Sequence, residues 1–210
     1  EGAGEDALAG DDVRDNLLAF IVAGHETTAL TLAWALYLLG FDESAQERAR
    51  EEARSVLGGR VAEASDVDRL PWIRAVLDET LRLYPPAAFL SRKATEVDEL
   101  AGHRVLPGDT VSVPIYAVHR HHRLWERPDA FDPSRFEGGV PVGRYAYLPF
   151  GDGPRVCIGA RFALQEAAII LSTLLARFRF RAVPGKDPVP TLVITTRPEG
   201  GVWLEVERLR

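Results

Sequence analysis

The chain has 210 residues, of which 46% are hydrophobic and 27% are charged, an ordinary balance for a globular protein with a substantial core. Its net charge of −6 argues against a general nucleic-acid binder, and its single cysteine excludes an internal disulfide. No secretory signal peptide is recognisable. Because methionine is absent and the first ten residues are polar and linker-like, we expect a linker at residues 1–10 and one part of a longer protein at 11–210.

A long apolar helix is predicted directly after this linker. Asp11 and Asp12 are good N-cap residues, the helical pattern continues to about Leu39, and Gly40 is expected to end it. The run from Leu17 to Leu39 is long enough to cross a bilayer, but a histidine, a glutamate and several threonines interrupt it. We therefore predict a buried core helix and no membrane segment.

The middle of this helix, Ala23-Gly24-His25-Glu26-Thr27-Thr28, contains residues that disfavour a helix. Glycine inside a helix costs about 1 kcal/mol relative to alanine. A zinc-protease motif fails because alanine stands at position 29, where a second histidine is needed. Two interpretations stay open. One is a small-residue surface that packs against another helix, and the other is an oxygen-handling notch, bent where the Thr27 hydroxyl bonds back to the Ala23 carbonyl.

Two more helices are predicted in the next part of the chain. Residues 44–57 are amphipathic and rich in charge, which indicates a solvated face that ends at Gly58-Gly59. Pro71 suits the first position of a helix that runs to Tyr84 before Pro85-Pro86. On this helix, a glutamate at 79 and an arginine at 82 could form an ordinary salt bridge between successive turns.

Short strands are predicted over residues 97–113, with turns at Ala101-Gly102 and Pro107-Gly108. His119, His121 and His122 could suggest a metal site, but no matching cysteine or carboxylate pattern accompanies them, so we interpret them as surface residues. Towards the C-terminus, residues 160–178 predict a helix. Residues 180–183, 192–196 and 202–206 predict strands, the last two joined through 198–201.

The cysteine lies in a glycine-rich loop, Phe150-Gly151-Asp152-Gly153-Pro154-Arg155-Val156-Cys157-Ile158-Gly159, directly before the predicted helix. Such dense glycines indicate sharp turns or a close approach to another group. A cysteine at the start of a helix faces free amide donors, which favours a thiolate, and Arg155 adds a positive charge for an acidic ligand group. On residue type alone, the alternative is a small buried apolar side chain.

The spacing of Phe150, Gly153, Arg155, Cys157 and Gly159 resembles the haem-binding loop of the cytochrome P450 family. Three other segments agree with the family in the same order. They are the distal-helix motif at 23–28, Glu-x-x-Arg at 79–82, and the segment 131–136, which supplies a later arginine. The resemblance covers residues 11–210 and implies the C-terminal half of the P450 fold, mainly α with small antiparallel β-sheets.

The resemblance also implies a role for each matching residue. Cys157 would be the metal ligand that holds the iron of haem b. Thr27 and Glu26 would be catalytic, the first stabilising the activated oxygen and the second supplying protons. The other implied residues are haem contacts at Phe150, Gly151, Arg155, Gly159, Ala23, Gly24, Arg92 and His119, a buried structural network of Glu79, Arg82 and Arg135, and a substrate lining of Ala87, Ala88, Phe89, Ile194 and Thr195.

The activity implied is that of a haem-thiolate monooxygenase, which inserts one atom of O2 into a small hydrophobic organic substrate with electrons from a ferredoxin or a diflavin reductase. The segment 119–161 has seven arginines against five acidic residues, which fits either a docking face for an acidic redox partner or an ordinary solvated surface. Two alternatives remain: a truncated haem-binding fragment without turnover, and a peroxygenase or isomerase. We expect a cytoplasmic, bacterial protein without nucleic-acid partners.

Overall fold

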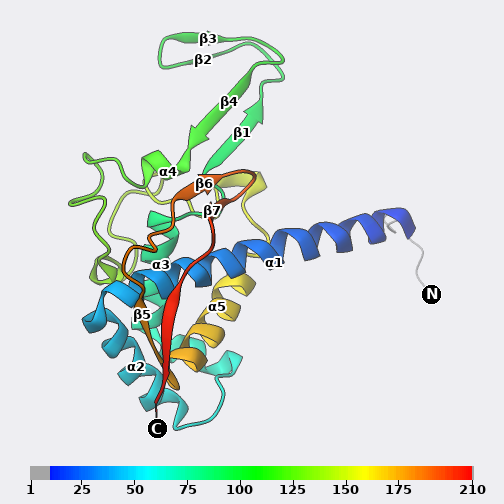
Figure 1. Cartoon of the computed structure of the whole chain (residues 1–210). Helices are drawn as coiled ribbons and strands as arrows, with labels where there is room; N and C mark the ends of the chain where they lie inside the picture. Colours follow the sequence, from blue (N-terminus) through cyan, green and yellow to red (C-terminus); the bar gives the residue numbers. More distant parts are fainter. Residues whose placement is uncertain (1–9, 210) are drawn as a thin grey trace.

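The helix α1 (Gly10–Phe41) runs across the whole molecule, and its first half projects beyond the other elements (Figure 1). The computed structural model describes residues 10–209. The predicted linker at 1–10 therefore lies outside the described residues, except for Gly10, where α1 begins. The other helices are α2 (Glu43–Leu57), η1 (Ala64–Arg69), α3 (Pro71–Leu83), α4 (Ile115–Val118), η2 (Pro133–Phe136), η3 (Gly153–Arg155) and α5 (Ala160–Leu175).

The two halves of α1 have different surroundings. Every side chain of residues 10–25 is exposed, whereas Thr28, Thr31, Trp34, Ala35 and Leu39 are buried. The prediction of a buried core helix is thus correct only for the second half. Among the described residues, α1 is also the one helix whose length and composition would allow it to span a membrane, a test that core helices of soluble proteins pass as well.

Gly40 has a different role from the predicted one. It does not end α1, which continues to Phe41. A Cβ atom at position 40 would lie 3.0 Å from the Ala182 backbone nitrogen and 3.1 Å from a methyl group of Leu204. The missing side chain therefore lets the last turn of α1 lie directly against the strand that contains Ala182.

The helix α2 is more deeply embedded than its charge pattern predicted. Alanines and a leucine face the core, but so do the polar side chains of Gln46 and Arg50, each 2% exposed. The Gln46 amide donates to the carbonyls of Leu39 and Phe180, both at 2.8 Å, and its oxygen accepts from the Phe180 N–H and from Arg50. Because all four hydrogen-bonding positions of this amide are occupied, its burial carries no unsatisfied group.

The strands form four antiparallel pairs within the described residues: β1 (Phe89–Lys93) with β4 (Thr110–Pro114), β2 (Asp98–Leu100) with β3 (His103–Val105), β5 (Phe178–Ala182) with β8 (Leu204–Arg208), and β6 (Pro190–Leu192) with β7 (Thr196–Pro198). The prediction of one strand over 192–196 is wrong, because residues 193–195 form the turn between β6 and β7. The last two strands do follow one another in the chain, but they do not pair as a hairpin, because β8 pairs with β5. The fold class, mainly α with small antiparallel sheets, is confirmed.

The hydrophobic core lies between α2, α3, α5 and the second half of α1 (Figure 1). The helix α5 contributes Ala167, Ala168, Leu171 and Leu175, and it ends at Leu175, three residues before the predicted end. Pro71 occupies the first turn of α3, and Glu52 of α2 accepts from the backbone N–H groups of Trp72 and Ile73 at 2.8 and 2.9 Å. The carboxylate thus caps a neighbouring helix and fixes α2 against α3.

Candidate functional site

The loop before α5 folds back on itself and presents its cysteine to solvent. Gly151 and Gly153 have φ angles of 75° and 74°, in the left-handed region that favours glycine. The Cys157 N–H donates to the Phe150 carbonyl at 2.9 Å, which closes the loop, and α5 starts three residues later. Cys157 is exposed, so the alternative of a small buried apolar residue is wrong.

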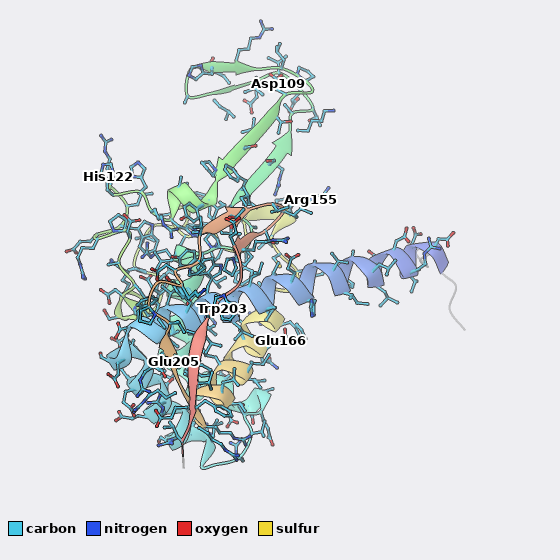
Figure 2. The ribbon with its side chains drawn as sticks, in the orientation of Figure 1. Asp109, His122, Arg155, Glu166, Trp203 and Glu205 are labelled. Carbon is cyan, nitrogen blue, oxygen red and sulfur yellow. The ribbon has the colours of Figure 1, made fainter. Side chains whose placement is uncertain are left out.

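Large apolar side chains beside Cys157 are also exposed. Ile158 is 86% exposed and Phe162 is 69% exposed, although both follow the cysteine closely in the chain. A Cβ atom on Gly159 would lie 3.9 Å from the Cys157 sulfur, so this glycine leaves one side of the sulfur open. The Arg155 label in Figure 2 marks the position of this loop. An exposed sulfur with large exposed apolar residues near it in the chain is suited to a large hydrophobic ligand.

The middle of α1 contains the hydrogen bond expected from the sequence. The Thr27 hydroxyl donates to the Ala23 carbonyl at 2.8 Å, and Thr31 repeats the pattern by donating to the Thr27 carbonyl at 2.9 Å. Ala23 and Gly24 are exposed, and a Cβ atom on Gly24 would meet nothing within 4 Å. This turn of α1 therefore borders open space.

Glu26, one residue before Thr27, is held by the far end of the chain. Its Oε1 atom accepts from the Thr195 hydroxyl at 2.8 Å and from Arg197 at 3.0 Å. Thr195 lies in the β6–β7 turn and is 8% exposed. Thr195 was predicted to line a substrate pocket, but its side chain binds Glu26, whereas Ile194 of the same turn is 84% exposed.

Two of the predicted substrate-lining residues, Ala88 and Phe89, border a pocket of about 240 Å³ together with Leu192 and Thr196. Ala87 is exposed at the end of the preceding turn. Arg92 lines a different cleft, of about 300 Å³, between β1 and the β2–β3 hairpin, and it donates to the Ser91 carbonyl at 2.8 Å. The structure therefore brings Ala88 and Phe89 to the β6–β7 hairpin and places Arg92 elsewhere.

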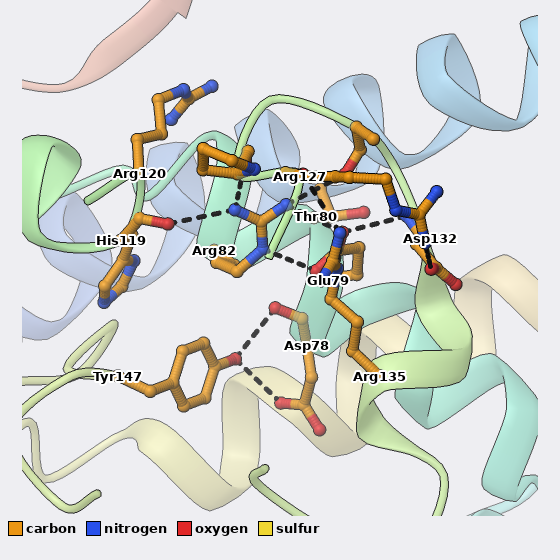
Figure 3. A network of polar contacts seen from close by, with 12 residues as sticks. Asp78, Glu79, Thr80, Arg82, His119, Arg120, Arg127, Asp132, Arg135 and Tyr147 are labelled. Carbon is orange, nitrogen blue, oxygen red and sulfur yellow. Dashed lines mark hydrogen bonds and ion pairs between the residues drawn. The ribbon is translucent and has the colours of Figure 1, made fainter. Parts of the chain in front are cut away.

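The buried network of polar contacts centres on Arg82 of α3, which is 0% exposed (Figure 3). It donates two hydrogen bonds to Glu79, at 2.7 and 2.8 Å. Its other bonds reach the backbone carbonyls of His119, Pro128 and Ala130, at 2.9, 2.5 and 3.0 Å. All five N–H groups of the guanidinium are thus used, and the irregular segment 119–130 is tied to α3.

Glu79 receives further contacts from the same segment. Its Oε1 atom accepts from the Asp132 N–H at 2.9 Å and lies 3.4 Å from Arg135 Nε, so the three predicted network residues meet. Burial raises the pKa of Glu79, and the hydrogen bonds and charge of Arg82 oppose this rise. Two guanidinium groups around one carboxylate provide the pairing that a buried charge requires.

His119 is 0% exposed, so its interpretation as a surface residue is wrong, whereas His121 and His122 are exposed as predicted. The His119 Nε2 atom accepts from the Leu148 N–H at 2.8 Å, and the ring stacks on Tyr147. Burial lowers the pKa of His119 to about 4. Nε2 is thus occupied by a backbone donor, whereas the Nδ1 atom is buried without a hydrogen-bond partner.

Tyr147 makes the second connection between α3 and the segment before the cysteine loop. Its hydroxyl donates to Asp78, at 2.9 Å to the backbone carbonyl and 3.1 Å to the carboxylate (Figure 3). Sequence reasoning missed Asp78, Tyr147 and the Leu148 contact. Only the position of Asp78 beside Glu79 could have suggested them, because the partners lie 69 and 29 residues apart in the chain.

The donor set at the cysteine loop fits a metal held mainly by a non-protein group. Among residues 10–209, no three histidine, cysteine or acidic side chains gather as a metal site. A lone exposed sulfur at the start of a helix supplies one ligand, and the other positions would have to come from a macrocycle such as haem. The exposed apolar side chains of Ile158 and Phe162, close to Cys157 in the chain, are compatible with an apolar macrocycle.

Comparison with known proteins agrees with this geometry. The family model "Cytochrome P450" matches residues 1–204. Cyclooctatin synthase of Streptomyces melanosporofaciens is 40% identical over 91% of this chain, which covers 42% of that protein. Putative cytochrome P450 132 of Mycobacterium tuberculosis is 39% identical over 90% of the chain, and human cytochrome P450 4F12 is 40% identical over 97%, with 41% and 40% of those proteins covered.

The chain belongs to the cytochrome P450 family, whose cofactor is haem. It spans about two fifths of the length of the curated relatives that it matches. These relatives come from both bacteria and mammals. The family and the fold class expected from the four sequence motifs are therefore confirmed.

Proposed function

We propose that the chain carries the haem-binding and oxygen-activating part of a haem-thiolate monooxygenase, with residues 11–210 as this portion and haem b as the cofactor. The observation that carries the proposal is the exposed sulfur of Cys157, the one cysteine of the chain, at the start of α5 in a loop that leaves it accessible. Bound haem would supply the activation of O2 for insertion of one oxygen atom into a small hydrophobic organic substrate.

Each residue of the chain has a separate task in this proposal. Cys157 holds the iron as a thiolate, and the backbone of Phe150, Gly151 and Gly159 shapes the loop around the sulfur. Arg155 pairs with an acidic group at the edge of the cofactor, a task also proposed for Arg92 and, through its unpartnered Nδ1 atom, for His119. Ala23 and Gly24 are exposed on α1, with open space beside Gly24, and would leave room there for the cofactor.

Two side chains of α1 handle protons. The Thr27 hydroxyl, fixed by its bond to the Ala23 carbonyl, still has lone pairs that can accept from water, and Glu26 can take up and release a proton one residue away. Substrate would lie against Ala88 and Phe89, which border the pocket of about 240 Å³, and we propose Ala87, Ile194 and Thr195 as further substrate-lining residues.

The first experiment replaces the iron ligand. In Cys157→Ala, the ferrous carbonyl complex should lose the red-shifted absorption that a thiolate ligand produces, because no other sulfur occurs in the sequence, which lacks methionine as well. Absorption spectra of the reduced, carbon-monoxide-treated protein measure this directly. A red-shifted band that survives in the variant would refute the assignment.

The second experiment tests proton handling. In Thr27→Ala, NADPH consumption should continue while product falls by about tenfold or more and peroxide rises, because positioned proton donors contribute about 10²- to 10⁴-fold. The matched control is Thr31→Ala, which removes the same kind of back-bonding hydroxyl one turn later. Equal coupling of NADPH to product in both variants would contradict the role of Thr27.

The main alternative is a haem-binding fragment without turnover. The exposed first half of α1 and the coverage of only two fifths of the relatives favour it, since further protein surface is needed to enclose a cofactor. Titration of the purified chain with haemin decides between the two, because saturable binding without product would support the fragment. Product analysis with labelled O2 separates monooxygenase from peroxygenase or isomerase activity.

Electrons would come from a ferredoxin or a diflavin reductase, whose acidic surface would dock near the cysteine loop. The support is three exposed arginines, Arg155 in the loop, Arg161 at the start of α5 and Arg144, which donates to Asp152 of the loop. We place the protein in the cytoplasm of a bacterium, where a single thiol stays reduced.

A further inference from the structure

The β6–β7 hairpin is bound to α1 and to the end of α3 at three successive residues. Thr195 and Arg197 donate to the Glu26 carboxylate, at 2.8 and 3.0 Å. Between them, the Thr196 N–H donates to the Pro86 carbonyl at 2.9 Å, and its carbonyl accepts from the Trp34 indole at 3.3 Å. Residue 196 is therefore fixed to the core, and the side chains on both sides of it converge on one carboxylate.

The same hairpin borders the pocket of about 240 Å³ through Leu192 and Thr196. Val193 and Ile194 extend from its turn into solvent, at 64% and 84% exposure. A group that binds in this pocket would therefore contact the two residues that flank the turn, Leu192 and Thr196, and the neighbours of Thr196 hold Glu26. Leu192, which borders the pocket, and Arg197, which holds the Glu26 carboxylate, are five residues apart in the chain.

The contact with Arg197 is well suited to be made and broken. The Arg197 and Glu26 side chains are 43% and 41% exposed, and ion pairs at such exposure are individually weak. The Nε atom of Arg197 is buried without a hydrogen-bond partner. Within residues 10–209, the guanidinium of Arg197 donates one hydrogen bond, to Glu26. Arg197 has no competing carboxylate there to hold it in place.

We propose that Arg197, with Thr195, is a positioning residue that fixes the Glu26 carboxylate beside Thr27 and couples it to ligand contact at the β6–β7 turn. This rests on the proposed function, in which Glu26 handles protons. Arg197 touches neither substrate nor cofactor in this scheme. It sets the direction of the carboxylate, and movement of the turn would change that direction.

Three variants of the haem-loaded protein test the proposal. Arg197→Gln removes the charge, and Arg197→Lys keeps it, which suffices for a contact made by a single N–H donor. The matched control is Arg181→Gln, which breaks an ion pair of similar length and exposure, Arg181 with Glu207 at 3.1 Å. Each variant is measured by amide hydrogen exchange of residues 190–199 and by the ratio of product to NADPH consumed.

Arg197→Gln should raise amide exchange in residues 190–199 several-fold and lower the ratio of product to NADPH several-fold. Arg197→Lys should bring the exchange and the ratio most of the way back to the values of the unmodified protein. Arg181→Gln should leave both values unchanged. Unchanged exchange in Arg197→Gln, or equal loss in Arg197→Gln and Arg197→Lys, would overturn the inference. The Thr27→Ala variant distinguishes a failure of the proposed function from a failure of this inference. If it stays coupled, the proposed function fails, whereas if it uncouples and Arg197→Gln does not, only this inference fails.

Discussion

Replacing Arg82 with methionine should lower the free energy of unfolding by about 3–5 kcal/mol, the cost typical of removing one partner from a buried ion pair. The change leaves Glu79, which is 0% exposed, without two of its hydrogen bonds, so that only the Asp132 N–H and the charge of Arg135 remain beside it. It also leaves the carbonyls of His119, Pro128 and Ala130 without their donor. Urea unfolding followed by circular dichroism measures the loss.

Two further variants separate the charge from the size of the side chain. The double variant Glu79→Met, Arg82→Met should lose less than the sum of the two single changes, because it removes both charges together. Arg181→Met, at an exposed ion pair, should change the free energy of unfolding by less than about 1 kcal/mol. A loss below about 1 kcal/mol in Arg82→Met would mean that the buried network does not stabilise the fold.

His119 should make the protein less stable in acid, by up to about 3 kcal/mol, since each unit of pKa shift corresponds to about 1.4 kcal/mol. Its pKa is about 4 in the folded chain, below the usual value of 6.5. Between these values the unfolded chain binds the proton more readily, so the free energy of unfolding falls as pH decreases from 6.5 to 4. Protonation of Nε2 would also break the bond from the Leu148 N–H.

The variant His119→Gln isolates this contribution, because glutamine can accept the same hydrogen bond without titrating. The difference in the free energy of unfolding between this variant and the unmodified protein should shift in favour of the variant as pH falls from 7 to 4. Urea unfolding at several pH values provides the curve, with the exposed His103→Gln as control. Parallel curves for His119→Gln and the unmodified protein would rule out the titration of His119 as the cause.

Local sequence signals predicted those parts of the fold that depend on neighbours in the chain. Pro71 predicted the start of α3, and Gly58 predicted the end of α2. The four-residue spacing of Ala23 and Thr27 predicted the hydrogen bond between them. The loop around Cys157 was recognisable because its glycines, arginine and cysteine lie within ten residues. Each of these features is decided by contacts over a few residues, which a single sequence displays directly.

Contacts between distant segments were not predictable in the same way. Gln46 was assigned to a solvated face because its neighbours are charged, yet it is buried by partners in β5, 134 residues away. Arg197 and Glu26 are separated by 171 residues, and nothing near either residue indicates the other. The pairing of β5 with β8 likewise joins segments more than twenty residues apart, with the β6–β7 hairpin between them in the chain, and no local pattern specifies it.

The helix α3 anchors the segment 119–132 and the segment that contains Tyr147, and this limits where residues can be inserted or deleted. Asp78, Glu79 and Arg82 lie within little more than one turn of α3. Inserting or deleting a single residue ahead of them would rotate all three by about 100° and detach both segments at once. Length variation should therefore be excluded from α3 and tolerated in the β2–β3 hairpin, whose residues are almost all exposed.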